Sequence, residues 1–246
     1  MKKVKIEQAG RLVDVVVYPV SRGRSTKAKR SPAENPSRSA RQTLNDLAAA
    51  RRFRLLLACN FSDADIVATL TYSDKFLPIN AGQANKLYLV PFINKLRPFM
   101  RSIGYELKYM YVTEGLHGDH RLHHHIVLPG LNGVRSIVRD LWFAGENVHF
   151  KCLGSGGIDA WAGYLTKEPR KTGRADRGDR MWTPSLYLRK PVVTEFKVDD
   201  DFYEFAPPSG AVVVFNETIR NDWFMAQYVS YRLPQDGQGV DNFGKV

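Results

Sequence analysis

The stretch YELKYMYVTEGLHGDHRLHHHIVLPG, residues 105–130, holds two strand-like segments on either side of a short polar turn. Residues 105–115 alternate apolar and polar side chains, and residues 122–130 are β-branched and apolar before a Pro-Gly pair ends them. The loop LHGDHR between them is short, so we expect the two strands to pair as an antiparallel hairpin. Five of the six histidines of the chain lie in this hairpin.

The three histidines at 123–125 are expected to lie on the second strand of the hairpin. Because side chains alternate between the two faces of a strand, His123 and His125 then share one face and His124 points to the other. A helical alternative would instead pair His120 with His124. The glycines just upstream of the run argue against a helix there.

Glu114 ends the first strand of the hairpin. In an antiparallel pair its carboxylate comes close to His123 or His125 on the same face. Two imidazoles and one carboxylate can hold one divalent ion and leave positions open for water and substrate. Mixed nitrogen and oxygen ligands without a thiolate suit Mn²⁺ or Mg²⁺, and zinc stays an alternative. A solvated histidine run without a metal is the competing interpretation.

The other histidines have different expected roles. His117 and His120 lie in the polar turn, where we expect them to face solvent or to make secondary DNA contacts. His149 belongs to the strand-like segment ENVHFKCL, and we expect it to pack within the sheet.

Outside the hairpin, helical and strand-like segments alternate along the chain. Pro91 and Pro98 are expected to kink or interrupt the helical stretch that contains them. This order predicts an α+β fold, a central and mainly antiparallel sheet flanked by helices. The expected strands are 11–20, 63–73, 105–115, 122–130 and 146–153, and the expected helices are 39–60, 81–104, 133–142 and 158–168.

Composition suggests three segments along the chain. Residues 1–38 contain an N-terminal strand and a basic, flexible linker, and residues 39–198 contain the predicted sheet and helices. Residues 199–246 form an acidic C-terminal extension with further strand-like pieces.

The net charge of +11 is concentrated in two blocks. Residues 1–54 contain 14 Lys and Arg against 4 Asp and Glu, and residues 167–190 contain 8 against 3. Basic blocks on either side of a near-neutral middle favour a polyanion such as nucleic acid, although a basic solvated surface is the alternative. The residues expected to contact DNA phosphates are Arg51, Arg52, Arg54, Arg121, Arg170, Lys171 and Arg174.

Two further features concern the cellular setting. The chain has no run of 18 apolar residues, so we expect no membrane partner. Cys59 and Cys152 are far apart and in apolar surroundings, which predicts buried free thiols in a reducing cytoplasm.

Tyr164 and Lys167 lie three residues apart on the predicted helix 158–168, hence on one face. A phenol has a pKa near 10 and is a weak nucleophile without assistance. A neighbouring ammonium can favour the phenolate and can also bind a phosphate. Such a pair is more often half-buried packing, so its significance depends on the histidines.

Taken in order, three motifs resemble those of the HUH endonucleases, specifically the rolling-circle replication initiators of phages and small plasmids. They are the strand IVATLTY at 66–72, Glu114 with RLHHHIVL at 121–128, and YLTKE at 164–168. The resemblance covers roughly residues 40–195. It implies a ferredoxin- or RRM-like arrangement of the sheet and helices.

The resemblance also implies a mechanism. Glu114, His123 and His125 would hold Mn²⁺ or Mg²⁺, and Tyr164 would attack a DNA phosphate to form a 5′-phosphotyrosyl link and free a 3′-OH primer. Lys167 would help to place the phosphate or the tyrosine. The position four residues before Tyr164 is Ala160, as in the single-tyrosine form of the family.

The implied biology is rolling-circle replication in the cytoplasm of a bacterial host. The partners would be single-stranded or origin-hairpin DNA, with a host helicase and polymerase, because the chain has no GxxxxGK[ST] motif of its own. Three alternatives stay open. They are a relaxase or transposase with the same chemistry, a non-catalytic basic nucleic-acid-binding protein with a structural metal, and a metal-dependent hydrolase that uses water. Aromatic side chains that could stack bases, or belong to the core, are Tyr72, Tyr109, Tyr111 and Trp182.

Overall fold

The computed structural model of the chain describes residues 1–20, 38–115, 121–167, 180–220 and 225–234. The chain divides into two compact units, which are described separately. One unit comprises residues 37–189, and the other comprises residues 1–36 together with 190–246.

The unit of residues 37–189 is built on a five-stranded sheet with the order β6-β3-β5-β4-β7. Every pair of neighbouring strands in it is antiparallel. Together with the helices on this sheet, that confirms the predicted α+β class. The strands are β3 (Ile66–Thr71), β4 (Met110–Glu114), β5 (His123–Leu128), β6 (Val148–Cys152) and β7 (Thr183–Pro184).

The predicted hairpin corresponds to the pair β4 and β5. Glu114 lies opposite His123, and Val112 lies opposite His125. On the other side of β5, Thr69 of β3 lies opposite His125. Because residues directly opposite one another share a face, this register places the ends of β4 and β5 side by side on one surface.

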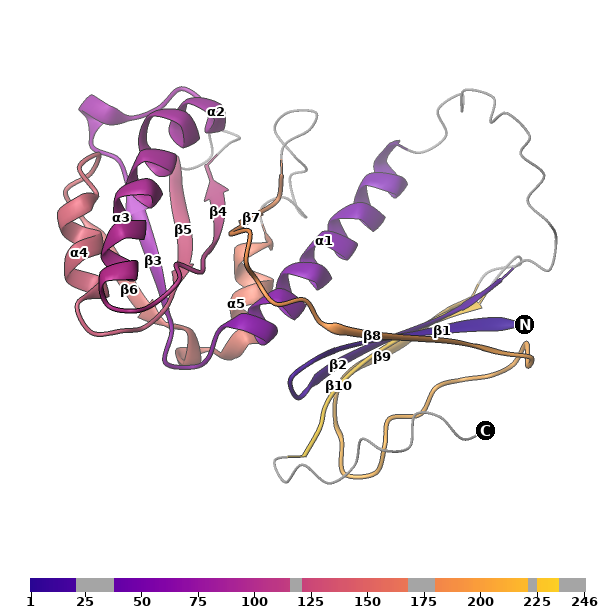
Figure 1. Cartoon of the computed structure of the whole chain (residues 1–246). Coiled ribbons are helices and arrows are strands. Elements are labelled where there is room, and N and C mark those ends of the chain that lie inside the picture. The colour runs from indigo at the N-terminus through magenta and orange to yellow at the C-terminus, as the bar shows by residue number, and fades with distance from the viewer. Residues whose placement is uncertain (21–37, 116–120, 168–179, 221–224, 235–246) are drawn as a thin grey trace. The chain divides into compact units, whose positions relative to one another are not determined.

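Helices cover both faces of this sheet (Figure 1). Helices α1 (Arg38–Asn60) and α5 (Gly157–Leu165) pack on the face that carries Val67 and Val127. Helices α3 (Val90–Ser102) and α4 (Val134–Leu141) pack on the opposite face. The apolar residues buried on the α3 and α4 side include Ile66, Leu70, Phe92, Leu96, Met100, Ile126, Leu128 and Val138.

The helical stretch expected at 81–104 changes type along its length. It contains α2 (Ala81–Ala84), the π-helix η2 (Asn85–Leu89) and then α3. The wider turn stands directly before Pro91, whose ring and missing N–H disfavour regular helix in the preceding turn. Pro98, by contrast, lies inside α3 without ending it. The buried side chains on either side of Pro98 favour a continuous helix.

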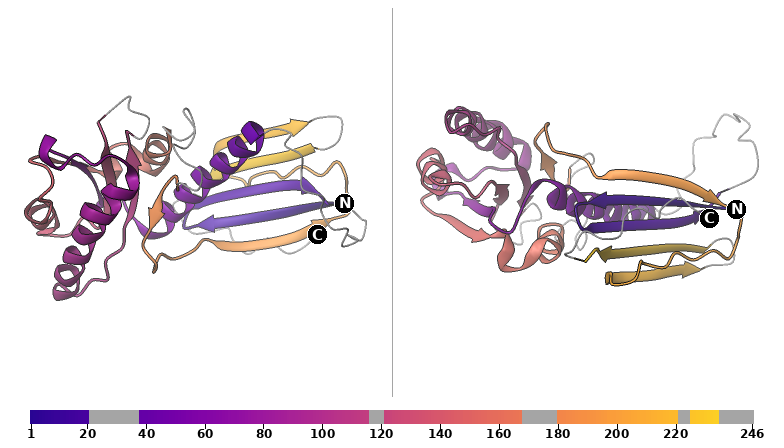
Figure 2. Two further views of the ribbon diagram at one scale, coloured as in Figure 1. Left: turned by 90° about the horizontal axis from the view of Figure 1, so that it is seen from above. Right: turned by 60° about the horizontal axis from the view of Figure 1, so that its bottom comes forward.

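The other unit contains a second antiparallel sheet, with the order β8-β1-β2-β10-β9 (Figure 2). One strand was expected at 11–20, and the structure shows two, which pair around Gly10 at φ 60°. Strands from both ends of the chain therefore form one sheet, while the expected division into three segments stays a prediction. The strands are β1 (Lys2–Ala9), β2 (Leu12–Pro19), β8 (Val192–Val198), β9 (Val212–Arg220) and β10 (Met225–Arg232).

The cysteines differ from the expectation of buried thiols. Both are free, but Cys59 is half-buried and Cys152 is exposed. Cys152 is the last residue of the edge strand β6, which leaves its side chain open on one side. Among the helices of the described residues, none is both long and apolar enough to cross a lipid bilayer.

Candidate metal centre and tyrosine

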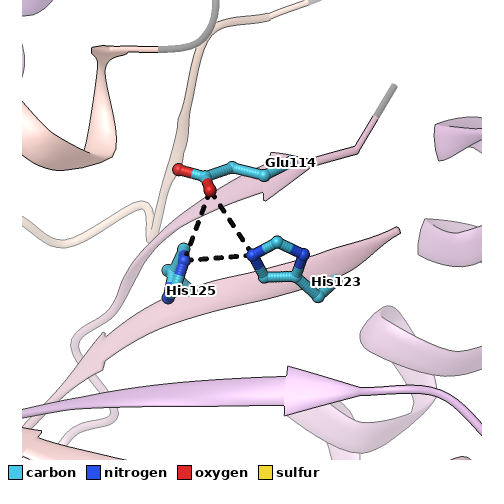
Figure 3. A group of neighbouring side chains, drawn as sticks. All are labelled: Glu114, His123 and His125. Atoms are coloured by element: carbon cyan, nitrogen blue, oxygen red, sulfur yellow. Dashed lines mark hydrogen bonds and ion pairs between the residues drawn. The ribbon is translucent and has the colours of Figure 1, made fainter. Parts of the chain in front are cut away.

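Glu114, His123 and His125 converge on the face of the sheet that also packs against α5 (Figure 3). The carboxylate comes from the end of β4 and the two imidazoles from the start of β5. Glu114 had been expected near one histidine, and its Oε2 lies 3.4 Å from Nε2 of His123 and 3.5 Å from Nε2 of His125. The two Nε2 atoms lie 3.2 Å apart.

These three edges fit the ligand set of a divalent metal. Ligand atoms about 2.1 Å from an ion, at angles of roughly 90° to 109°, are about 3.0 to 3.5 Å from one another. The three observed separations fall in that range. Within the part of the chain that the structure describes, this is the one group of three or more acidic, histidine or cysteine side chains arranged to hold a metal.

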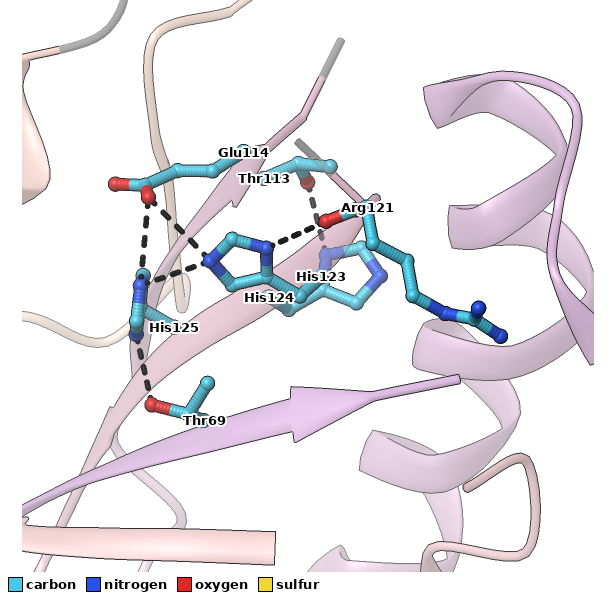
Figure 4. Close-up of polar contacts among 7 residues, drawn as sticks. All are labelled: Thr69, Thr113, Glu114, Arg121, His123, His124 and His125. Atoms are coloured by element: carbon cyan, nitrogen blue, oxygen red, sulfur yellow. Dashed lines mark hydrogen bonds and ion pairs between the residues drawn. The ribbon is translucent and has the colours of Figure 1, made fainter. Parts of the chain in front are cut away.

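Hydrogen bonds to the far side of each ring orient the two histidines (Figure 4). Nδ1 of His123 donates to the backbone carbonyl of Arg121 at 2.8 Å. A carbonyl can only accept, so a neutral His123 has its proton on Nδ1 and a free lone pair on Nε2. Nδ1 of His125 lies 3.0 Å from Oγ1 of Thr69. Such outer contacts fix ring orientation at metal sites.

The electrostatics of the cluster favour an ionised carboxylate. Burial raises the pKa of Glu114, but hydrogen bonds and charge interactions with His123 and His125 outweigh it and lower the pKa to about 2. Glu114 is therefore an anion at neutral pH. A carboxylate beside two inward-facing imidazole nitrogens is the charge arrangement that attracts a cation.

His124 points to the opposite face and is fully buried. Its Nε2 lies 2.7 Å from the hydroxyl of Tyr72, and its Nδ1 lies 2.9 Å from Oγ1 of Thr113. Burial, together with the charges of His123 and His125, lowers the pKa of His124 to about 3. His124 is thus a neutral core residue that links β5 to β3 and β4, as the alternation of a strand predicts.

Tyr164 lies beside the cluster. Its ring centroid is 5.6 Å from that of His125, and its side chain is 46% exposed. Nζ of Lys167 lies 5.7 Å from the centroid of the tyrosine ring. Burial, and then the negative charge of Glu114, raise the pKa of Tyr164. The phenol therefore remains protonated at neutral pH unless a cation offsets that charge.

A cavity of about 490 Å³ opens in front of the cluster. It is bounded by strands β3, β5 and β6 and by the first turns of α5. Its lining joins the metal-ligating histidines to the tyrosine, so a substrate in this cavity would contact both. The lining residues are Thr69, His123, His125, His149, Lys151, Ser155, Gly156, Ala160, Trp161 and Tyr164.

The arginines expected to bind DNA have varied surroundings. Arg54 pairs with Asp159 of α5 at 3.6 Å, and Arg121 pairs with Asp74 at 2.7 Å while its Nε donates to the carbonyl of Tyr72. Arg51 and Arg52 lie on α1. The remaining predicted DNA contacts, and the two histidines of the polar turn, lie outside the described residues. They are Arg170, Lys171, Arg174, His117 and His120.

The aromatic side chains suggested for base stacking lie mostly in the interior. Tyr72 and Tyr111 are buried among the residues under α3, and Tyr109 is half-buried at their edge. Trp182 packs on Phe53, and its indole N–H donates to the carbonyl of Ala49. These contacts favour the core interpretation for all four.

Two features of the site were missed in the sequence. Thr69 contacts His125 only because β3 and β5 are neighbours in the sheet, which the sequence does not reveal. The expectation that His149 packs within the sheet was wrong, because His149 is exposed and lines the cavity. Alternation in VHFKC offered a signal. Val148 and Phe150 pack inward, which turns His149 and Lys151 to the other face.

Residues 65–172 match the family model of the replication-associated protein ORF2. The matched segment contains β3, the hairpin with Glu114, His123 and His125, and the helix with Tyr164. The match supports a replication-associated role for this chain. No curated protein and no solved structure matches the chain.

Proposed function

We propose that this protein initiates rolling-circle DNA replication by nicking one strand with Tyr164, in the manner of the HUH endonucleases. The observation that carries this proposal is the position of Tyr164. A tyrosine on α5 lies against His125 at the mouth of a cavity that also contains His123. This group falls within the segment that matches a replication-associated family.

The reaction is a transesterification. Oη of Tyr164 attacks the phosphorus of a phosphodiester, a tyrosyl O–P bond forms, and the bond between phosphorus and the 3′ oxygen breaks. The phenolic proton leaves, and the departing 3′ oxygen takes up a proton to become the 3′-OH primer. The DNA is held meanwhile through a 5′-phosphotyrosyl ester.

Glu114, His123 and His125 would hold Mn²⁺ or Mg²⁺ at this site. A bound divalent ion supplies Lewis-acid polarisation of the scissile phosphate and positive charge close to the attacking oxygen. The chain itself orients the two imidazoles through Thr69 and the carbonyl of Arg121. Lys167, whose ammonium lies over the tyrosine ring, is placed to meet the phosphate or to favour the phenolate.

The proposed partners follow from this chemistry. The substrate is single-stranded DNA, such as the loop of an origin hairpin, and a host helicase and polymerase act on the nicked product. We place the reaction in the cytoplasm of a bacterial host, where replication of a phage or plasmid would occur.

The test is covalent capture. Purified protein is incubated with a pool of labelled stem-loop oligonucleotides, with Mn²⁺ or with EDTA, and resolved on denaturing gels. We expect a metal-dependent protein–DNA band that is lost in Tyr164→Phe. The matched control is Tyr105→Phe, because Tyr105 lies in the same unit with 51% exposure. Mass spectrometry of the band should place the phosphoryl link on Tyr164.

Other outcomes point to the other functions. Cleavage that persists in Tyr164→Phe without any adduct would indicate a hydrolase that activates water. DNA retention without cleavage would indicate a binding protein with a structural metal. An adduct restricted to oligonucleotides from transfer origins or transposon ends would keep the chemistry and change the biology to a relaxase or transposase.

A further inference from the structure

The edge strand β6 extends the face of the sheet that carries the metal ligands. Thr69 lies opposite His125 on one side and opposite His149 on the other. One row across three strands therefore contains His149, Thr69 and His125 on a common face. Lys151, two residues after His149, shares this face and lies opposite Val67.

The side chains of His149 and Lys151 are exposed and both line the cavity in front of the cluster. The residues that line this cavity include no aspartate or glutamate. Within the described parts of the chain, Lys151 has no carboxylate partner. A lysine that lines a cavity without a counter-ion carries a charge available to an anionic ligand.

We propose that His149 and Lys151 form a phosphate-binding subsite, which holds a second phosphodiester of single-stranded DNA beside the one that is cleaved. This inference rests on the proposed function, because it names how the same substrate lies in the site. Lys151 supplies the charge, and His149 supplies a ring nitrogen for a hydrogen bond to a phosphate oxygen.

The spacing of the strands separates this subsite from the cluster. Neighbouring strands are about 4.8 Å apart, so β6 lies about 10 Å from β5. A phosphate bound at Lys151 therefore belongs to a different nucleotide from the phosphate at the metal ligands. Two anchored phosphates fix the direction of the strand across the cavity, which aligns the scissile bond with Tyr164.

Lys151 is a positioning residue in this proposal and makes no contact with the reacting atoms. Another explanation for it exists, since charged side chains on an edge strand prevent pairing with other chains. That role requires no DNA contact. The two explanations differ in how binding responds to salt and to the charge of a single phosphate.

The experiment measures equilibrium binding of a cleavable stem-loop oligonucleotide by fluorescence anisotropy across a series of salt concentrations. All proteins carry Tyr164→Phe, so that no covalent step intervenes. We expect Lys151→Gln to weaken binding about fivefold and to reduce the slope of log K against log salt by about 0.7, one phosphate contact to a single strand. His149→Ala should weaken binding without changing the slope by as much. The control Lys95→Gln, an exposed lysine of α3, which packs on the opposite face, should change neither quantity.

A methylphosphonate series identifies the phosphate concerned. Neutral methylphosphonate is placed at each position of the oligonucleotide in turn. At one position next to the cleavage site it should weaken binding to the protein with Lys151 and have no effect on Lys151→Gln. If Lys151→Gln keeps the full salt slope, or responds at every position as its parent does, the subsite is refuted.

The failure of this inference can be distinguished from the failure of the proposed function. Loss of the covalent band, with the methylphosphonate effect retained, would refute nicking by Tyr164 and leave a phosphate subsite in a binding protein. A normal covalent band, with no effect of Lys151→Gln on binding, would refute the subsite alone. Circular dichroism of each variant should be unchanged, because both side chains are exposed on an edge strand.

Discussion

Glu114 and His123 lie opposite each other at the open end of the β4–β5 hairpin, with 3.4 Å between Oε2 and Nε2. The carboxylate reaches His125 as well, at 3.5 Å, although His125 lies two residues further along β5. One side chain thus completes a ligand triangle with two imidazoles on the neighbouring strand.

Removal of this carboxylate should abolish metal binding more than it alters the fold. Glu114→Gln keeps the shape of the side chain but removes the charge that attracts the cation. We expect Mn²⁺ affinity, measured by isothermal titration calorimetry, to fall by at least about a hundredfold, since a ligand is worth more than the 10- to 100-fold of an outer contact. Retention of wild-type affinity would mean that the cluster is not the metal site.

Thr69 is predicted to orient His125. Thr69→Val removes the hydroxyl beside Nδ1 of His125 and nearly preserves the side-chain volume. Loss of such an outer contact typically lowers metal affinity about 10- to 100-fold. The matched control is Thr71→Val on the same strand, whose hydroxyl donates to the carbonyl of Asn147, outside the cluster. Equal Mn²⁺ affinity in the two variants would show that Thr69 has no such role.

His124 is predicted to make stability depend on pH. Its pKa falls from an ordinary 6.5 to about 3 in the folded chain, so the unfolded chain binds the extra proton between these values. The free energy of unfolding should therefore decrease as pH falls from about 6.5 towards 3, by at most ~1.4 kcal/mol per pH unit from this group. Urea unfolding of the wild type and of His124→Gln at pH 7, 6 and 5 measures it. The gap between them should narrow as pH falls, and a constant gap would contradict the prediction.

The nicking rate is predicted to rise with pH. Burial and the charge of Glu114 raise the pKa of Tyr164, so the reactive phenolate is the minor form at neutral pH. Single-turnover adduct formation in Mn²⁺ should accelerate between about pH 7 and 9. Lys167→Gln should slow it by about tenfold or more if the ammonium favours the phenolate or meets the phosphate. A rate independent of both pH and Lys167 would exclude loss of the tyrosine proton as part of the limiting step.

Arg54 is predicted to stabilise the fold and to contribute little to DNA binding. Its guanidinium lies 3.6 Å from the carboxylate of Asp159, and its side chain is only 11% exposed. Arg54→Leu should lower the free energy of unfolding by about 1 to 3 kcal/mol, because it leaves Asp159 without this partner in a partly buried place. The salt slope of DNA binding should stay unchanged. A reduced slope with normal stability would instead place Arg54 on the DNA.

The amino-acid sequence by itself determined the local geometry of the site. Strand alternation turns His123 and His125 to one face and His124 to the other, and the short turn makes Glu114 a neighbour of this run. These relationships hold within one hairpin, so they follow from local spacing. The α+β class followed similarly from the order of strand-like and helical segments.

Only the tertiary structure decided what meets the hairpin. Tyr164 reaches His125 because Ala162 and Leu165 of α5 bury against Phe53 and Val67, and no local pattern records that packing. Thr69 and His149 join the site because β3 lies between β5 and β6 in the sheet. Contacts between distant segments depend on which buried surfaces fit together, and a single sequence specifies that choice only through the whole fold.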